Sequence, residues 1–109
     1  SKPGYRSVSV DDFQHLIADS SVIRLDVRTA KEFDEGHIPN AVNIDVLHPD
    51  FLQKALSSLP RKRTIAVNCR SGKRSKKAAE LLAKKGYKVV ELDTGFNGWL
   101  EEGKEVTKE

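Results

Sequence analysis

Residues 64–75 read TIAVNCRSGKRS, and this stretch decides the fold and points to one site. It opens with a short apolar run at residues 64–68, as expected of a buried strand, and Cys69 stands at the carboxyl end of that run. A loop containing Gly72 follows. Apolar residues at helical spacing come next, namely Ala78, Ala79, Leu81 and Leu82. The stretch therefore predicts a strand, a tight loop and a helix in succession.

The rest of the chain repeats this alternation. Strands are expected around Val8 and Val10 and at residues 22–27, 41–44 and 89–92. Helices are expected at residues 10–17, 29–36 and 51–59, with a short segment around 96–100. Such alternation predicts an α/β domain with a mainly parallel sheet. Ligands of these sheets bind beyond the carboxyl ends of the strands, so the end of residues 64–68 is the first place to look for a site.

Length and composition limit the alternatives. The 109 residues fit a single domain, residues 1–109, with a core of about 7–103. One cysteine excludes an internal disulfide, and three scattered histidines give no reason to expect a metal site. No apolar stretch approaches the roughly 18 residues of a membrane span, so no membrane association is expected. The compartment is unknown from the sequence: a cytoplasmic location is slightly favoured, and a periplasmic one is left open if a signal peptide was removed, since the chain has no initiator methionine.

Basic residues gather around the Cys69 loop. Residues 61–88 hold eleven basic side chains and one acidic one, whereas the flanking segments are net acidic. Lys76, Lys77, Lys84 and Lys85 are expected to form a solvated face with at most a steering role. This block has a single aromatic residue and no nucleic-acid-binding motif, so a nucleic-acid partner is not expected.

Cys69 itself stands where a strand gives way to the start of a helix. The first N–H groups of a helix lack intrahelical partners and, with the helix dipole, attract anions. Gly72 permits the positive φ or close backbone approach that so tight a loop needs. Arg70, Lys73 and Arg74 add positive charge beside the sulfur. These features predict a Cys69 thiolate nucleophile in an anion-attracting pocket, in preference to an inert buried cysteine.

Four blocks of sequence together resemble a known family. They are LDVRTAKEF at residues 25–33, GHIPNAVNI at 36–44, CRSGKRS at 69–75 and GFNGW at 95–99. In this order and spacing they resemble a single-domain rhodanese, a sulfurtransferase of the rhodanese homology superfamily. The resemblance covers nearly the whole chain from about Val8 onward.

The resemblance implies a five-stranded parallel sheet with helices on both faces, and a sulfurtransferase without a cofactor. The thiolate of Cys69 would take a sulfane sulfur from a small anionic donor such as thiosulfate and carry it as a persulfide. Cyanide or a protein thiol would accept the sulfur, and the protein would act as a monomer. Substrate-binding residues would be those of the loop, namely Arg70, Ser71, Gly72, Lys73 and Arg74.

Some roles stay open at this point. Arg74 either contacts the donor or braces the loop, and Asp26, Arg28 and Glu32 are interpreted as structural. A non-catalytic rhodanese-like binding or regulatory module is the main alternative. Loss of the cysteine would favour such a module, but Cys69 is present. Related phosphatases place five residues between cysteine and arginine, whereas four separate Cys69 from Arg74, so phosphatase activity is disfavoured.

Overall fold

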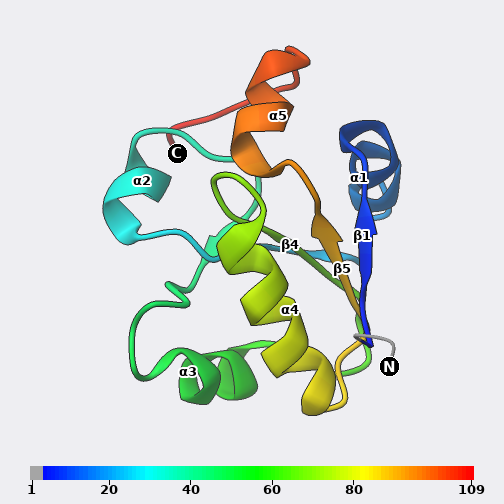
Figure 1. The fold of residues 1–109 in the computed structure, drawn as a ribbon, viewed down its shortest axis with the longest axis vertical. Helices are drawn as coiled ribbons and strands as arrows, with labels where there is room; N and C mark the ends of the chain where they lie inside the picture. The colour runs from blue at the N-terminus through cyan, green and yellow to red at the C-terminus, as the bar shows by residue number, and fades with distance from the viewer. Residues whose placement is uncertain (1–3) are drawn as a thin grey trace.

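The computed structural model describes residues 4–109 and contains one sheet of five parallel strands (Figure 1). Across the sheet the strands follow the order β1-β5-β4-β2-β3, which puts β4 at the centre. Their bounds are β1 (Arg6–Val8), β2 (Ile23–Asp26), β3 (Val42–Asn43), β4 (Ile65–Asn68) and β5 (Val89–Leu92). All pairings are parallel, so the carboxyl ends of the strands meet at one edge of the sheet. The expected five-stranded parallel sheet is confirmed.

Five helices connect or follow these strands within the described residues. Their bounds are α1 (Val10–Ile17), α2 (Ala30–Asp34), α3 (Phe51–Ser58), α4 (Lys73–Lys84) and α5 (Gly95–Glu101). Local capping explains two of the starts: the Ser9 hydroxyl accepts from the Asp12 N–H, and Thr29 forms a capping box with Glu32. The assignment of Val10 to the first strand is wrong, because the cap at Ser9 already begins α1 there.

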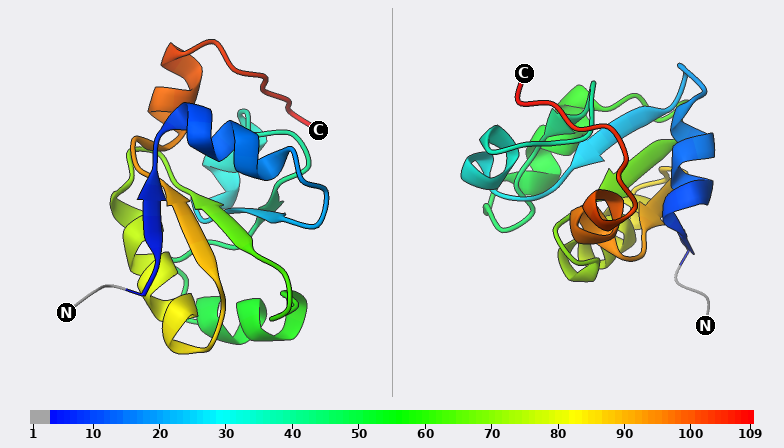
Figure 2. Two further views of the ribbon diagram at one scale, coloured as in Figure 1. Left: turned by 90° about the vertical axis from the view of Figure 1, so that its right-hand side faces the viewer. Right: turned by 90° about the horizontal axis from the view of Figure 1, so that it is seen from above.

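The helices cover both faces of the sheet (Figure 2). Side chains of β4 alternate between two buried clusters. Ile65 and Val67 pack with residues of α3 and α4, and Cys69 belongs to the same cluster. Ala66 packs on the opposite side with residues of α1 and α5. The base of the Cys69 loop is therefore fixed in the core of the molecule.

Residues after α5 return to the body of the domain. The N–H of His37 donates to the carbonyl of Thr107 at 2.8 Å, and the N–H of Thr107 donates back at 2.9 Å. The indole N–H of Trp99 donates to the carbonyl of Glu105 at 2.8 Å. Ordered structure thus extends past the expected core of residues 7–103.

Among residues 4–109, no helix combines the length and the apolar composition needed to cross a bilayer.

Candidate active site

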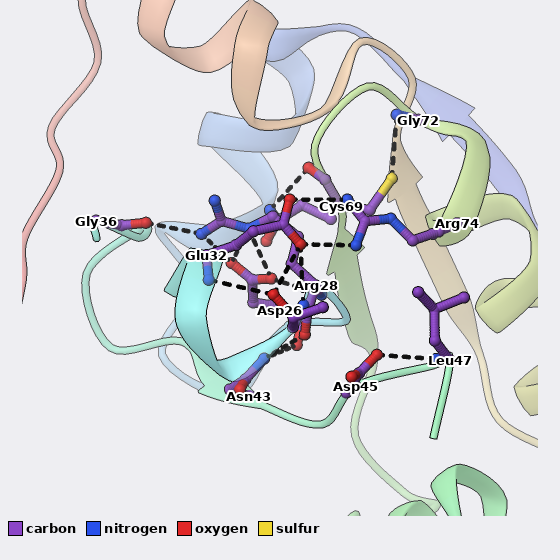
Figure 3. A network of polar contacts seen from close by, with 12 residues as sticks. Asp26, Arg28, Glu32, Gly36, Asn43, Asp45, Leu47, Cys69, Gly72 and Arg74 are labelled. Atoms are coloured by element: carbon purple, nitrogen blue, oxygen red, sulfur yellow. Dashed lines mark hydrogen bonds and ion pairs between the residues drawn. The ribbon is translucent and has the colours of Figure 1, made fainter. Parts of the chain in front are cut away.

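Cys69 directly follows β4, and only 1% of its surface is exposed. Its Sγ accepts a hydrogen bond from the N–H of Gly72 at 3.1 Å (Figure 3). Gly72 adopts a φ of 100°, in the region that favours glycine. A Cβ at this position would also overlap the carbonyl of Asp93. The loop thus requires glycine at position 72 both for its backbone conformation and for space.

The start of α5 holds the same loop from the other side. The N–H of Phe96 donates to the carbonyl of Cys69 at 2.8 Å, and that of Asn97 donates to the carbonyl of Arg70 at 2.9 Å. Gly95 makes this approach possible, since a Cβ there would lie 2.5 Å from the Arg70 carbonyl oxygen. The loop's carbonyls at positions 69 and 70 are therefore occupied by hydrogen-bond donors.

The loop's N–H groups are used differently. Within residues 4–109, the backbone N–H groups of Arg70 and Ser71 have no hydrogen-bond acceptor. The N–H groups at the start of α4 add the unpaired donors that any helix N-terminus carries. With its carbonyls occupied and N–H groups free, the loop offers donors to an anion.

The charged side chains of the loop divide into two kinds. Arg70 and Lys73 are exposed, and across residues 4–109 their side chains form no hydrogen bond or ion pair. Arg74 instead donates to both carboxylate oxygens of Glu32, at 2.7 and 3.0 Å. Hydrogen bonding with Glu32 raises the pKa of Arg74, and the same bonds lower the pKa of Glu32 to about 2. Of the two roles left open for Arg74, this geometry favours bracing the loop.

A buried ion pair supports the neighbouring strand end. Arg28 and Asp26 lie 2.8 Å apart, and both are almost fully buried. Arg28 also donates to the carbonyl of Gly36 at 2.7 Å, and its guanidinium lies 4.3 Å from the ring centre of Phe96. The side-chain amide of Asn43 donates to the carbonyls of Asp26 and Arg28. Asp26 and Arg28, interpreted from the sequence as structural, pair with each other, and the pair joins β2 to α5.

A cleft of about 220 Å³ adjoins the loop between α2 and α5. Arg70 and Asn97 line it on one side, and Glu32 and Glu35 line it on the other. Leu100, half of which is exposed, lies at its rim. Arg70 therefore faces a space large enough for a small molecule, next to the loop that begins at Cys69.

Lys76 differs from the sequence-based expectation. Its ammonium donates to the carbonyl of Gly72 at 3.2 Å and to the carboxylate of Asp93 at 2.9 Å. Assigning Lys76 to a purely solvated face is therefore wrong, because the turn after β5 packs against the first turn of α4. The one signal in the sequence was Glu91, a carboxylate within the otherwise apolar strand β5.

Fold and site together define an α/β domain whose central strand delivers a buried cysteine to a loop of backbone donors. The sequence matches the family model described as Rhodanese-like domain over residues 9–102, and the chain belongs to this family.

Relatives with known names agree with this assignment. The chain is 35% identical over 89 residues to "Thiosulfate sulfurtransferase 16, chloroplastic" from Arabidopsis thaliana, covering 72% of this chain and 74% of that protein. It is 32% identical over 91 residues to "Sulfurtransferase" from Allochromatium vinosum, covering 83% and 82%. A rhodanese-related protein from Thermoplasma volcanium has a similar crystal structure, with a TM-score of 0.85, 34% identity and coverage of 96% and 100%. The resemblance seen in the sequence is confirmed, and it places the chain among proteins of sulfur transfer.

Proposed function

We propose that this protein is a thiosulfate sulfurtransferase that works through a persulfide on Cys69. The observation that supports this most directly is the hydrogen bond from the Gly72 N–H to the Cys69 Sγ at 3.1 Å, beside the free N–H groups of Arg70 and Ser71. Such donors stabilise negative charge on sulfur, both in the resting thiolate and in the persulfide. The name of the relative from Arabidopsis thaliana favours thiosulfate as donor.

The first half-reaction loads the enzyme. The Cys69 thiolate attacks the outer, sulfane sulfur of thiosulfate and forms a new S–S bond. The original S–S bond of thiosulfate breaks, and sulfite leaves with its electron pair. Arg70 and Lys73 would bind the sulfonate oxygens, since their side chains are exposed and have no partner within residues 4–109. Ser71 would contribute its free backbone N–H to the same anion, while the N–H of Gly72 stays on the sulfur of Cys69.

The second half-reaction returns the enzyme to its starting state. A thiophilic acceptor, either cyanide or a thiolate, attacks the terminal sulfur of the persulfide. The S–S bond to Cys69 breaks, and the cysteine leaves as a thiolate. The acceptor departs as thiocyanate or as a persulfide of its own. The loop's donors again face a sulfur anion, so the same geometry serves both half-reactions.

Intact mass spectrometry tests the covalent step directly. Freshly reduced protein treated with thiosulfate should gain one sulfur atom, and cyanide should remove it. Cys69→Ser should gain none. If reduced wild type never gains the sulfur, the proposal fails. A non-catalytic rhodanese-like module would then be the better reading, and a retained fold with no turnover would be its expected signature.

A further inference from the structure

Lys76 connects the catalytic loop to the strand behind it. Its ammonium lies 3.2 Å from the carbonyl oxygen of Gly72, 2.9 Å from Asp93 Oδ1 and 3.3 Å from Glu91 Oε2. These contacts come from three places: the N-cap of α4, the turn after β5, and β5 itself. One side chain therefore fixes the loop, its helix and the neighbouring strand relative to one another.

The carboxylate of Glu91 explains why the ammonium group of Lys76 is held beside β5. Its side chain is fully buried, and Oε1 accepts a hydrogen bond from the Ser75 hydroxyl at 2.6 Å. Oε2 has no hydrogen-bond partner within residues 4–109, and Lys76 is the cation that faces it. A buried carboxylate is costly unless it is paired. Burial acts to lower the pKa of Lys76, but Asp93 and Glu91 outweigh this effect and raise it, so the ammonium stays charged.

The position of Gly72 links this network to the sulfur. The same residue that gives its carbonyl to Lys76 donates its N–H to Cys69 Sγ. The left-handed conformation and the close contact with the Asp93 carbonyl require glycine at this position, so the residue has no side chain that could anchor it. Lys76 is accordingly the side chain that holds this residue, through its carbonyl oxygen.

We propose that Lys76, held by Glu91 and Asp93, is a positioning residue that keeps the Gly72 N–H directed at the sulfur of Cys69. Its role in turnover rests on the proposed function, but its effect on the thiol does not. Lys76 acts through Gly72 and is not expected to bind the donor. Its loss should therefore lower kcat and leave KM for thiosulfate nearly unchanged.

Lys76→Met tests the proposal, since methionine keeps an unbranched stem and removes the ammonium. The matched control is Lys77→Met, which removes the same charge from the next residue of α4, an exposed one without a partner among residues 4–109. Loss of one directed hydrogen bond predicts a decrease of roughly three- to tenfold in kcat for Lys76→Met. KM should change by less than about twofold, and the control should match wild type.

Alkylation of Cys69 by iodoacetamide at neutral pH gives a second readout that needs no sulfur transfer. If Lys76 positions the N–H, Lys76→Met stabilises the thiolate less and alkylation slows, by roughly three- to tenfold. If Lys76 only keeps the loop closed over a buried sulfur, its loss exposes Cys69 and alkylation becomes faster. An unchanged or faster rate overturns the proposal.

Two further variants test whether the effect of Lys76→Met comes from losing the charge that Glu91 holds in place. Glu91→Gln keeps an acceptor for the Ser75 hydroxyl but removes the charge that holds Lys76, so it should slow alkylation in the same direction. Lys76→Arg keeps the positive charge and should recover part of the rate. If wild type forms no persulfide, the proposed function fails, whereas the alkylation rates still decide the role of Lys76.

Discussion

Arg70 and Arg74 belong to one short loop, yet their surroundings assign them different roles. The Arg70 side chain is exposed beside the cleft, and its own backbone carbonyl is fixed by α5. The Arg74 guanidinium is held by Glu32 through two hydrogen bonds. The free guanidinium is suited to bind a substrate, and the paired one to hold the loop in shape.

This difference leads to a prediction about donor binding. Arg70→Ala should raise KM for thiosulfate several-fold and change kcat much less, because the lost contact binds the ground state and the transition state alike. Steady-state kinetics in the thiosulfate-to-cyanide assay would measure both constants. Lys77→Ala serves as the control for a general loss of charge on α4. An unchanged KM for Arg70→Ala would return this residue to the solvated surface.

The pair formed by Arg74 and Glu32 predicts how stability depends on pH. The pKa of Glu32 is lowered to about 2 by Arg74, against 4.5 for an unperturbed carboxyl group. Unfolded chains therefore take up this proton first as the pH falls. The contribution of Glu32 is complete above about pH 4.5 and is lost progressively towards about pH 2.

Urea denaturation across that pH range tests the pair. Glu32→Gln should lower the free energy of unfolding at neutral pH by on the order of 2 kcal/mol and flatten its dependence on pH below about 4.5. Glu80→Gln removes a carboxylate from the exposed pair with Lys84, whose atoms lie 3.7 Å apart, and should leave the profile as it is in wild type. Equal slopes for Glu32→Gln and wild type would contradict the assignment.

Helix α5 and its N-cap, Thr94, show how two neighbouring residues depend on each other. A Cβ added at Gly98 would overlap the hydroxyl of Thr94, one turn earlier. Gly98→Ala should therefore destabilise the protein by about 1–3 kcal/mol, although alanine favours a helix. In a Thr94→Gly background the overlap is absent, and the same substitution should be neutral or stabilising. Chemical denaturation of the four proteins measures this coupling, and additive effects would argue against it.

Features that are determined by residues close together in the sequence could be predicted from it. The capping box of Thr29 and Glu32 and the apolar run of β4 needed no knowledge of distant residues. Cys69 was placed correctly at the end of β4 for the same reason. Pairing of Arg74 with Glu32 and of Lys76 with Glu91 depends on how α2, α4 and β5 pack. The first pair is separated by 42 positions in the sequence and the second by 15. No local sequence pattern predicts contacts over such separations, so these roles could be assigned only from the structure.

For the molecule as a whole, the basic segment of residues 61–88 divides between the two edges of the sheet. Its basic residues at 70, 73, 74, 76 and 77 follow β4 in the Cys69 loop and the start of α4, whereas those at 61–63 precede β4 and those at 84, 85 and 88 precede β5, at the opposite edge. A doubly charged donor should therefore be attracted from a distance, and salt should screen that attraction.

Raising the ionic strength tests this attraction. KM for thiosulfate should increase with added sodium chloride, while kcat should change little because the backbone donors act at short range. Alkylation by neutral iodoacetamide serves as the control and should respond much less. A KM independent of salt would show that the basic side chains near the Cys69 loop do not attract the donor.

The segment after α5 has a consequence for protein engineering. The family match ends at residue 102, and a designer guided by it would place a fusion junction there. Such a junction would separate Thr107 from the backbone of His37 and Glu105 from the indole of Trp99. A tag or second domain is better attached beyond Thr107, so that the segment after α5 keeps its contacts with His37 and Trp99 and the added part begins outside the fold.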